Sequence, residues 1–207
     1  MQKNITIAVD AMGGDNSPKK VLDGINHNFD IKNNVFYKIF GNEEVIKKNI
    51  PKSIPSNFYE IIHANDEVKG TDSALSAAKR GKNTSMWLAI DSVKNKDSDI
   101  VISAGNTGAL FVIAKLNLKM IENIDKPALA GLWPNKNGTN IVLDLGASID
   151  CSEKNLVDFG IMGSALLKAL FHNEDPKVAI LNIGSEEIKG HEIIKNAYEI
   201  LNSNKNS

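Results

Sequence analysis

Residues 99–118, DIVISAGNTGALFVIAKLNL, contain every part of a strand–turn–helix unit. Residues 99–102 end in three β-branched apolar side chains, which are typical of a buried strand. Residues 103–108 are all small or polar and include two glycines, so they predict a tight turn. Residues 109–118 are mostly apolar and predict a helix that begins at this turn. A strand that passes through a glycine-containing turn into a helix is the repeating unit of α/β folds.

The same alternation of short apolar runs and longer amphipathic runs continues along the whole chain. Further strands are predicted at residues 5–9, 35–40, 58–63, 128–133, 140–145 and 178–183. Further helices are predicted at residues 17–29, 71–80, 84–93, 152–171 and 190–201, with a short one between Asn42 and Pro51. Strands separated by helices favour βαβ units. We therefore expect one α/β domain over residues 1–207, with a mostly parallel sheet and helices on both faces.

Four polar residues stand where helices are expected to begin: Ser17, Asn42, Thr84 and Ser152. Side-chain oxygens of these residue types accept hydrogen bonds from the first N–H groups of a helix. Ser17, Asn42 and Thr84 are therefore predicted as N-caps, and Pro18 suits the first turn after Ser17. Ser152 with Glu153 is expected to start a long helix.

The composition is that of an ordinary globular protein, with 42% hydrophobic and 24% charged residues. Lysine and arginine total 24 against 25 aspartate and glutamate residues, a formal net charge of −1. This balance argues against a general nucleic-acid binder. Arg80 is the only arginine. A bound anion would therefore depend mostly on backbone N–H groups, helix ends and lysines.

The chain is expected to be soluble and cytoplasmic. Cys151 is the only cysteine, so no disulfide can form within the chain. The N-terminal residues lack the long apolar segment of a signal peptide. The apolar run at residues 109–114 is far shorter than the roughly 20 residues that span a bilayer.

Polar and glycine residues gather after four of the predicted strands, at residues 10–15, 103–108, 144–150 and 182–190. The carboxyl ends of parallel strands share one edge of a sheet, where ligands of α/β proteins bind. We expect these loops to meet there, although each alone also fits an ordinary turn. The candidate substrate-binding residues are Asp10, Gly13, Gly14, Asp15, Asp144, Gly146, Ala147, Asp150 and Glu186.

The turn at residues 103–108 is the strongest candidate for an anion site. Its side chains are small enough for backbone N–H groups to approach a ligand, and the positive end of a helix dipole follows. Inorganic phosphate or a phosphoryl group fits this chemistry. The candidate phosphate-binding residues are Ser103, Gly105, Asn106, Thr107 and Gly108.

Several other kinds of site are disfavoured. The sequence has neither a P-loop motif nor a dinucleotide-binding glycine motif after the first strand. The four histidines are scattered, which argues against structural zinc, and none lies near Cys151 to activate it as a nucleophile. A metal held by Asp10, Asp15, Asp144 and Asp150 is the lesser alternative to helix caps.

One basic concentration stands out, formed by Lys79, Arg80, Lys82, Lys94 and Lys96. A solvated helical face explains it most simply, and docking of an acidic protein is the functional alternative.

Several motifs, in this order, resemble the phosphate acyltransferase (PlsX) family of bacterial phospholipid synthesis. They are VDAMGGD at residues 9–15, ISAGNTGAL at 102–110, DKPAL at 125–129, LDLGA at 143–147, IMGS at 161–164 and LNIG at 181–184, followed by Glu186, Lys189 and Gly190.

The resemblance implies a fold like that of isopropylmalate and isocitrate dehydrogenases, and a homodimer. It implies transfer of a fatty acyl group from acyl carrier protein to inorganic phosphate, without a cofactor, and peripheral association with the membrane. Lys189 matches the lysine of the family's Glu-x-x-Lys-Gly motif and would be catalytic. Acyl carrier protein is acidic, so it is a candidate partner for the basic concentration.

The chain also departs from the family pattern. Ser148 stands where an asparagine is usual, Ala74 where proline is common, and Lys79 where arginine is common. Family members are longer, so the chain corresponds to the N-terminal two thirds of such a protein. A non-catalytic remnant that binds phosphate or carrier protein is therefore one alternative. A phosphotransacetylase that uses coenzyme A is another, and the acyl-chain preference is not specified by these motifs.

Overall fold

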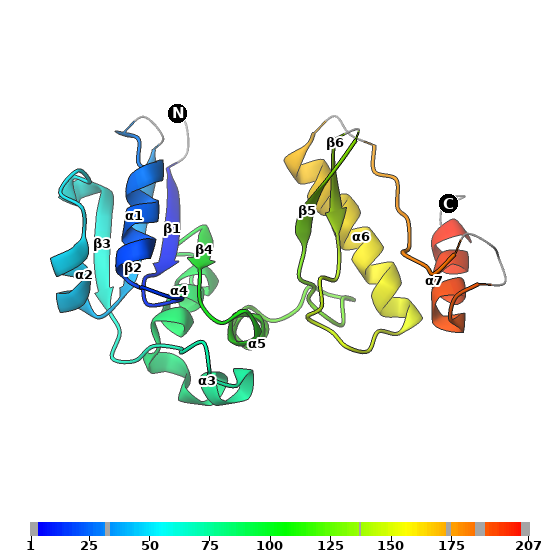
Figure 1. The fold of residues 1–207 in the computed structure, drawn as a ribbon, viewed down its shortest axis with the longest axis horizontal. Coiled ribbons are helices and arrows are strands. Elements are labelled where there is room, and N and C mark those ends of the chain that lie inside the picture. Colours follow the sequence, from blue (N-terminus) through cyan, green and yellow to red (C-terminus); the bar gives the residue numbers. More distant parts are fainter. Residues whose placement is uncertain (1–3, 32–33, 137, 173–174, 185–188, 204–207) are drawn as a thin grey trace. The chain divides into compact units, whose positions relative to one another are not determined.

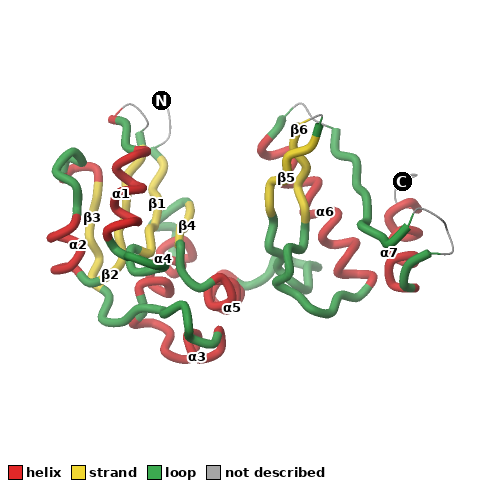
Figure 2. Tube along the Cα trace, viewed as in Figure 1, coloured by secondary structure: helices red, strands yellow, loops and turns green. Residues whose placement is uncertain are grey.

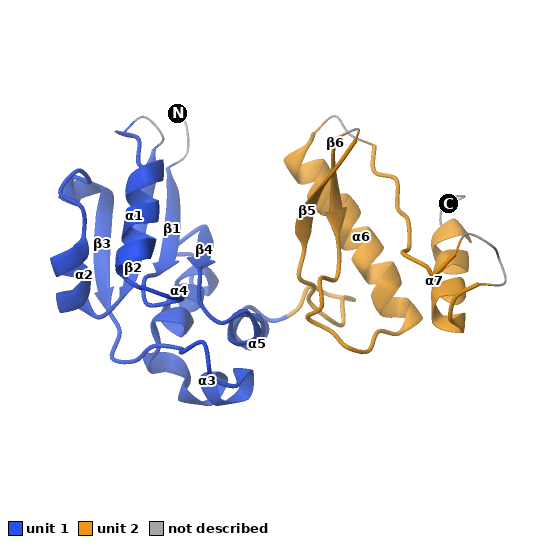
Figure 3. Ribbon diagram, in the orientation of Figure 1, with its two compact units in different colours: residues 1–119 blue, residues 120–207 orange. Residues whose placement is uncertain are grey.

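A computed structural model describes residues 4–31, 34–136, 138–172, 175–184 and 189–203. Contacts within the chain group it into two compact units, residues 1–119 and residues 120–207 (Figure 3). Each unit is described by itself. The expectation of one domain over residues 1–207 stays a prediction.

The first unit is built on a four-stranded parallel sheet (Figures 1 and 2). Its strands are β1 (Ile5–Asp10), β2 (Val35–Gly41), β3 (Tyr59–His63) and β4 (Ile100–Ser103). They lie in the order β3-β2-β1-β4, and every neighbouring pair is parallel. The predicted α/β class with a mostly parallel sheet is therefore confirmed.

Helices cover both faces of this sheet. The helices of this unit are α1 (Lys19–Asn28), α2 (Glu43–Asn49), α3 (Ala74–Arg80), α4 (Ser85–Lys94) and α5 (Thr107–Leu118), with short 3₁₀ turns at Ser56–Phe58 and Gly81–Asn83. Successive side chains of a strand point to opposite faces. Val9 of β1 accordingly packs with Leu22 of α1, whereas its neighbour Ala8 packs with Ala89 of α4. A further apolar cluster joins α4 to α5 through Met86, Ile90, Ala109 and Ile113.

Two of the three predicted caps are confirmed. Asn42 and Thr84 accept hydrogen bonds from the N–H groups of Val45 and Trp87, at 3.1 and 3.3 Å. Ser152 forms a reciprocal capping box in the second unit. The prediction for Ser17 is wrong, because its hydroxyl donates to the carbonyl of Gly13 at 2.6 Å and α1 begins only at Lys19.

The second unit contains a β-hairpin and two helices: β5 (Gly131–Asn135), β6 (Gly138–Val142), α6 (Glu153–Leu170) and α7 (Glu192–Ser203). Strands had been expected at residues 128–133 and 140–145 as part of a parallel sheet. They lie instead at β5 and β6 and pair antiparallel. Parallel pairing needs a crossover of a dozen or more residues, and the link between β5 and β6 is far shorter.

The strand predicted at residues 178–183 is wrong. The segment is described and is not a strand, although its side chains are largely apolar. Leu181 and Ile183 are 94% and 83% exposed, so the apolar pattern here does not mark a buried strand. Among the described residues, no helix combines the length and apolar character that crossing a membrane requires.

Candidate functional site

The carboxyl ends of β1 and β4 lie side by side in the first unit. Asp10 and Ser103, the last residues of these two strands, are partners in the parallel ladder. The strand order also reverses here, since β2 and β3 lie on one side of β1 and β4 on the other. Open α/β sheets bind ligands outside the carboxyl ends of strands at such a reversal. The topology therefore selects the loops at residues 10–15 and 103–108 as the candidate site.

Asp10 is the buried centre of a hydrogen-bond network at this edge, with only 1% of its surface exposed. Its Oδ1 accepts from the hydroxyl of Ser85 at 2.7 Å and from the N–H of Met12 at 3.3 Å. Its Oδ2 accepts from the hydroxyl of Ser103 at 2.7 Å. The Ser103 oxygen in turn accepts from the N–H of Gly105 at 3.2 Å. A buried carboxylate is thus satisfied by neutral donors from three separate segments.

Glycine is required where the two loops touch. A Cβ atom on Gly13 would lie 2.7 Å from Oδ2 of Asp10 and 2.8 Å from the backbone nitrogen of Gly105. Gly14 has a φ of +90°, and its Cβ would lie 2.5 Å from the carbonyl oxygen of Ala104. The adjacent glycines therefore let the two loops approach to backbone contact. Asp15, the next residue, is exposed.

Asn106 fixes the beginning of α5. Its Oδ1 accepts from the N–H of Ala109 at 3.0 Å, which is an N-cap. Its Nδ2 donates to the carbonyls of Gly70 and Asp72, at 3.1 and 2.9 Å. The side chain thus both caps the helix and holds the loop at residues 66–72 beside it.

Two exposed residues have open backbone donors at this helix start. In the described ranges of the chain, no hydrogen bond uses the N–H of Thr107 or of Gly108. Both residues are exposed. Unpaired N–H groups at the positive end of a helix dipole attract anions. The arrangement is therefore chemically suited to an anion such as phosphate.

Arg80 stabilises the loop at residues 66–72 from its other side. Its guanidinium forms ion pairs with Asp72 and, at 3.3 Å, with Asp66. The carboxylate of Asp72 also accepts from the N–H of Lys69 at 2.8 Å. Because Arg80 is engaged within the unit, it adds little to the basic concentration predicted around it. Lys79, Lys82 and Lys96 are exposed, and Lys94 contacts Asp91 and Asn117.

In the second unit, Asp144 organises the loop that follows β6. Its Oδ1 accepts from the N–H groups of Leu129 and Ala147, at 2.9 and 3.2 Å. Its Oδ2 accepts from the N–H of Ser148 at 2.8 Å. The bond from residue 148 uses the backbone, so it is independent of whether serine or asparagine stands there. Gly146 lies in the same loop with a φ of +97°.

The remaining candidates also belong to the second unit. The carbonyl of Asp150 accepts from the amine of Lys126 at 2.7 Å. Lys189 is exposed, and its carbonyl accepts from the side-chain amide of Asn182 at 3.3 Å. Glu186 lies outside the described residues. That the loops of the two units meet at one rim stays a prediction, as do the roles of the individual site residues.

Cys151 is half-buried and directly precedes Ser152, the N-cap of α6. Within the part of the chain that the structure describes, no three His, Cys, Asp or Glu residues are grouped so that they could hold a metal ion.

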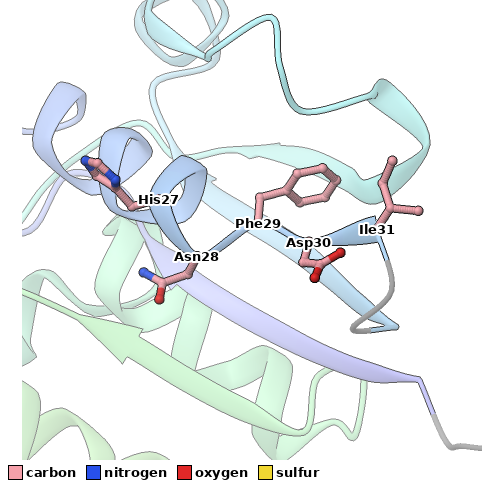
Figure 4. A pocket seen from close by; sticks show the side chains of 5 residues that line it. All are labelled: His27, Asn28, Phe29, Asp30 and Ile31. Carbon is pink, nitrogen blue, oxygen red and sulfur yellow. The ribbon is translucent and has the colours of Figure 1, made fainter.

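A surface depression elsewhere in the first unit is lined by His27, Asn28, Phe29, Asp30 and Ile31 (Figure 4). It lies where α1 ends, and the chain goes on from there to the first residue of β2. This is the opposite end of the strands from Asp10 and Ser103. The side chains splay in different directions instead of converging. The depression is therefore separate from the candidate site.

A family model described as fatty acid synthesis protein matches residues 5–207. The chain belongs to this family. A phosphate acyltransferase from Pelagibacter ubique (strain HTCC1062) is 66% identical over 207 residues, which are 100% of this chain and 62% of that protein. Another, from Bradyrhizobium diazoefficiens, is 41% identical over 203 residues, or 97% of this chain and 58% of that protein. The chain thus spans about three fifths of the length of these relatives.

A solved structure, the EutD phosphotransacetylase from Staphylococcus aureus, has a similar fold. It is 15% identical, with a TM-score of 0.62, over 98% of this chain and 65% of that one. At this identity the similarity concerns the fold alone, and it agrees with the α/β class. The more specific likeness to isopropylmalate and isocitrate dehydrogenases stays a prediction.

The sequence of this member of the fatty acid synthesis protein family also contains a signal for Ser85. The pattern at residues 84–93 predicts Ser85 only as part of a helix, yet its hydroxyl donates to Asp10. Ser85, Ala89 and Ser92 are small residues at helical spacing, and all three are buried on α4. Such a stripe indicates a helix face that packs closely against a sheet. That pattern could have placed Ser85 near the end of β1.

Proposed function

We propose that this protein transfers a fatty acyl group from acyl carrier protein to inorganic phosphate, forming acyl phosphate for phospholipid synthesis. The observation that carries the proposal is the 66% identity, over all 207 residues, to a phosphate acyltransferase. The site at the ends of β1 and β4 supports it, because open N–H groups at a helix start suit a phosphate.

In the proposed reaction, a phosphate oxygen attacks the thioester carbonyl carbon. The new C–O bond forms, the C–S bond breaks, and the thiolate of the carrier protein leaves. Phosphate is already an anion at neutral pH, so it needs little help from a general base. It needs positioning and neutralisation of its charge. Thr107 and Gly108 would position it, together with the loop formed by Ser103, Gly105 and Asn106.

We assign the neutralising role to Lys189, whose amine would stabilise the oxyanion and the departing thiolate. The loop at residues 144–150 and Glu186 would contact substrate in the same proposal, as would the loop at residues 10–15. No cofactor takes part in this chemistry.

Acyl carrier protein is the proposed macromolecular partner. Lys79 and Lys82 are exposed beside each other at the end of α3 and in the following 3₁₀ turn. Their charges are available to an acidic surface, in contrast to that of Arg80. The proposal also includes a homodimer, and a cytoplasmic protein with peripheral attachment to the membrane.

The direct test measures acyl phosphate formation by the 207-residue chain from an acyl carrier protein thioester, with and without phosphate. We expect turnover only with phosphate, and loss of turnover in Lys189→Ala. Lys177→Ala, which removes another exposed lysine of the same unit, is the matched control and should retain activity. Activity that survives in Lys189→Ala would remove this lysine from the mechanism.

Two further measurements distinguish the proposed acyltransferase from a non-catalytic remnant and from a phosphotransacetylase. A chain that binds phosphate or carrier protein without turnover would be a non-catalytic remnant. Faster turnover with a coenzyme A thioester than with the carrier-protein thioester would identify a phosphotransacetylase.

A further inference from the structure

We propose that Ser85, Asp10 and Ser103 form a positioning network that shapes the phosphate site, and that Ser103 does not itself bind the phosphate. This inference rests on the proposed function, because it concerns the same site. It gives Ser85 a role that the motifs of the sequence do not indicate.

The first argument is the direction of the hydrogen bonds. A serine hydroxyl has a single hydrogen to donate. The hydroxyl of Ser103 donates it to Oδ2 of Asp10, 2.7 Å away. The Ser103 oxygen already accepts from the N–H of Gly105. A phosphate oxygen needs a donor, and Ser103 has none left to offer.

The second argument is that Ser85 connects the end of β1 to the loop at residues 66–72. Its hydroxyl donates to Asp10 at 2.7 Å, and its backbone N–H donates to the carbonyl of Asp66 at 3.0 Å. Asp66 begins the loop that Asn106 holds beside the start of α5. Both bonds of Ser85 are buried, as the residue is only 1% exposed. One residue of α4 thus links the end of β1 to the loop beside the anion site.

The third argument is the tight packing around the network. Gly13 lies against Asp10, Ser103 and Gly105 so closely that a Cβ atom would collide with all three. The Asp10 carboxylate is also bonded to Ser103, whose oxygen accepts from the N–H of Gly105, and this segment leads directly into α5. The network is in this way mechanically coupled to the N–H groups of Thr107 and Gly108.

The α4 helix offers a matched control for a test of Ser85. Ser92 lies on the same helix, is also buried, and exchanges a hydrogen bond of 2.8 Å with the buried hydroxyl of Ser98. Ser85→Ala and Ser92→Ala each remove one buried hydroxyl bond from α4. Only Ser85→Ala touches Asp10, so the two variants separate positioning from stability.

The experiment titrates inorganic phosphate into the isotope-labelled 207-residue chain and follows the amide NMR signals of Gly105, Thr107 and Gly108. We expect Ser85→Ala to weaken the phosphate Kd about three- to tenfold, the range that the loss of one buried hydrogen bond gives. Ser92→Ala should keep the Kd within about twofold of the wild type. Urea unfolding should show a similar loss of stability in both variants.

A double-mutant cycle tests the claim about Ser103. If Ser85 and Ser103 both act through Asp10, the effects of Ser85→Ala and Ser103→Ala on the Kd are less than multiplicative. Effects that multiply would show that Ser103 contacts the phosphate directly and would overturn that claim.

The outcomes distinguish the two proposals. A wild-type chain that binds no phosphate at Thr107 and Gly108 overturns the proposed phosphate site itself. A wild-type chain that binds phosphate, with equal affinities in Ser85→Ala and Ser92→Ala, overturns the positioning network alone. If Ser85→Ala does not fold, Ser85→Cys replaces it, because a thiol has almost the same shape and is a weak donor. Wild-type affinity in Ser85→Cys would likewise refute the network.

Discussion

Substitution of Asn106 by alanine should destabilise the first unit more than loss of an ordinary helix cap does. The side chain accepts one hydrogen bond from Ala109 and donates two, to Gly70 and Asp72. Loss of an asparagine cap costs about 1 kcal/mol. Each further bond contributes about 0.5–1.5 kcal/mol, less for the exposed bond to Gly70 than for the half-buried one to Asp72. We expect a total loss of about 2–3 kcal/mol.

Asn42 is the matched control, because its Oδ1 caps α2 through Val45 in the same way. Asn42→Ala should lower the free energy of unfolding by about 1 kcal/mol, measured by urea denaturation. In hydrogen exchange, Asn106→Ala should also speed exchange at the N–H groups of Lys69 and Asp72, which bond within the held loop. Equal losses in Asn106→Ala and Asn42→Ala, with unchanged exchange in the loop, would refute the idea that Asn106 clamps it.

Two further predictions concern single positions in the two units. Gly14→Ala should lower the free energy of unfolding by about 2 kcal/mol or more, and the urea midpoint with it, since it combines a positive φ with a Cβ placed against the carbonyl of Ala104; a midpoint equal to that of wild type would contradict the described loop contact. In the second unit, hydrogen bonds from Lys154 to Asp158 and to Asp125 raise the pKa of the Lys154 amine. The stabilisation it provides is therefore complete below its unfolded-state pKa, about 10.4, and is lost as the pH rises through the higher folded-state value. Lys154→Met should be less stable than wild type at pH 7, and the difference should shrink as the pH rises above the ordinary range of lysine pKa values; a pH-independent difference would exclude the ion pairs as its cause.

Most helices and strands of the first unit could be predicted from the sequence, because the patterns that specify them are local. The β-branched runs, the caps at Asn42 and Thr84, and the turn at residues 103–108 each act within a few residues. Their elements formed where expected, with boundaries shifted by a few residues. The parallel arrangement followed from the helices between the strands, because a right-handed crossover is the standard way to connect strands of one sheet.

The second unit was harder to predict because pairing depends on what lies beside a strand. The apolar runs near residues 131 and 142 carry no sign of direction, and the short link between them decided the antiparallel pairing. The apolar pattern at residues 178–183 predicts a strand, but a strand also needs a neighbouring strand for its backbone hydrogen bonds. The pattern carries no information about such a neighbour.

In the candidate site, too, local features could be predicted from the sequence and long-range contacts could not. The glycines and small residues of its two loops were visible in the sequence as turn residues. The hydrogen bonds that organise the site could not be predicted from local patterns. Asp10 accepts them from Ser85 and Ser103, which are 75 and 93 residues away in the sequence. Ser17 illustrates the opposite error, because a residue type that suits a cap instead bonds to the loop carbonyl of Gly13.

The distribution of charge in the first unit indicates that the proposed reaction needs an additional cation. Arg80 is paired with Asp66 and Asp72, and the polar atoms of Asp10 and Ser103 are bonded to each other. The open donors at the start of α5 within the described residues, which include the N–H groups of Thr107 and Gly108, are therefore neutral. A helix end is equivalent to about half a positive charge, whereas phosphate carries more than one negative charge near neutral pH. Transfer of an acyl group to such an anion needs a cation beyond α5, and this need is the physical reason for assigning the neutralising role to a lysine such as Lys189.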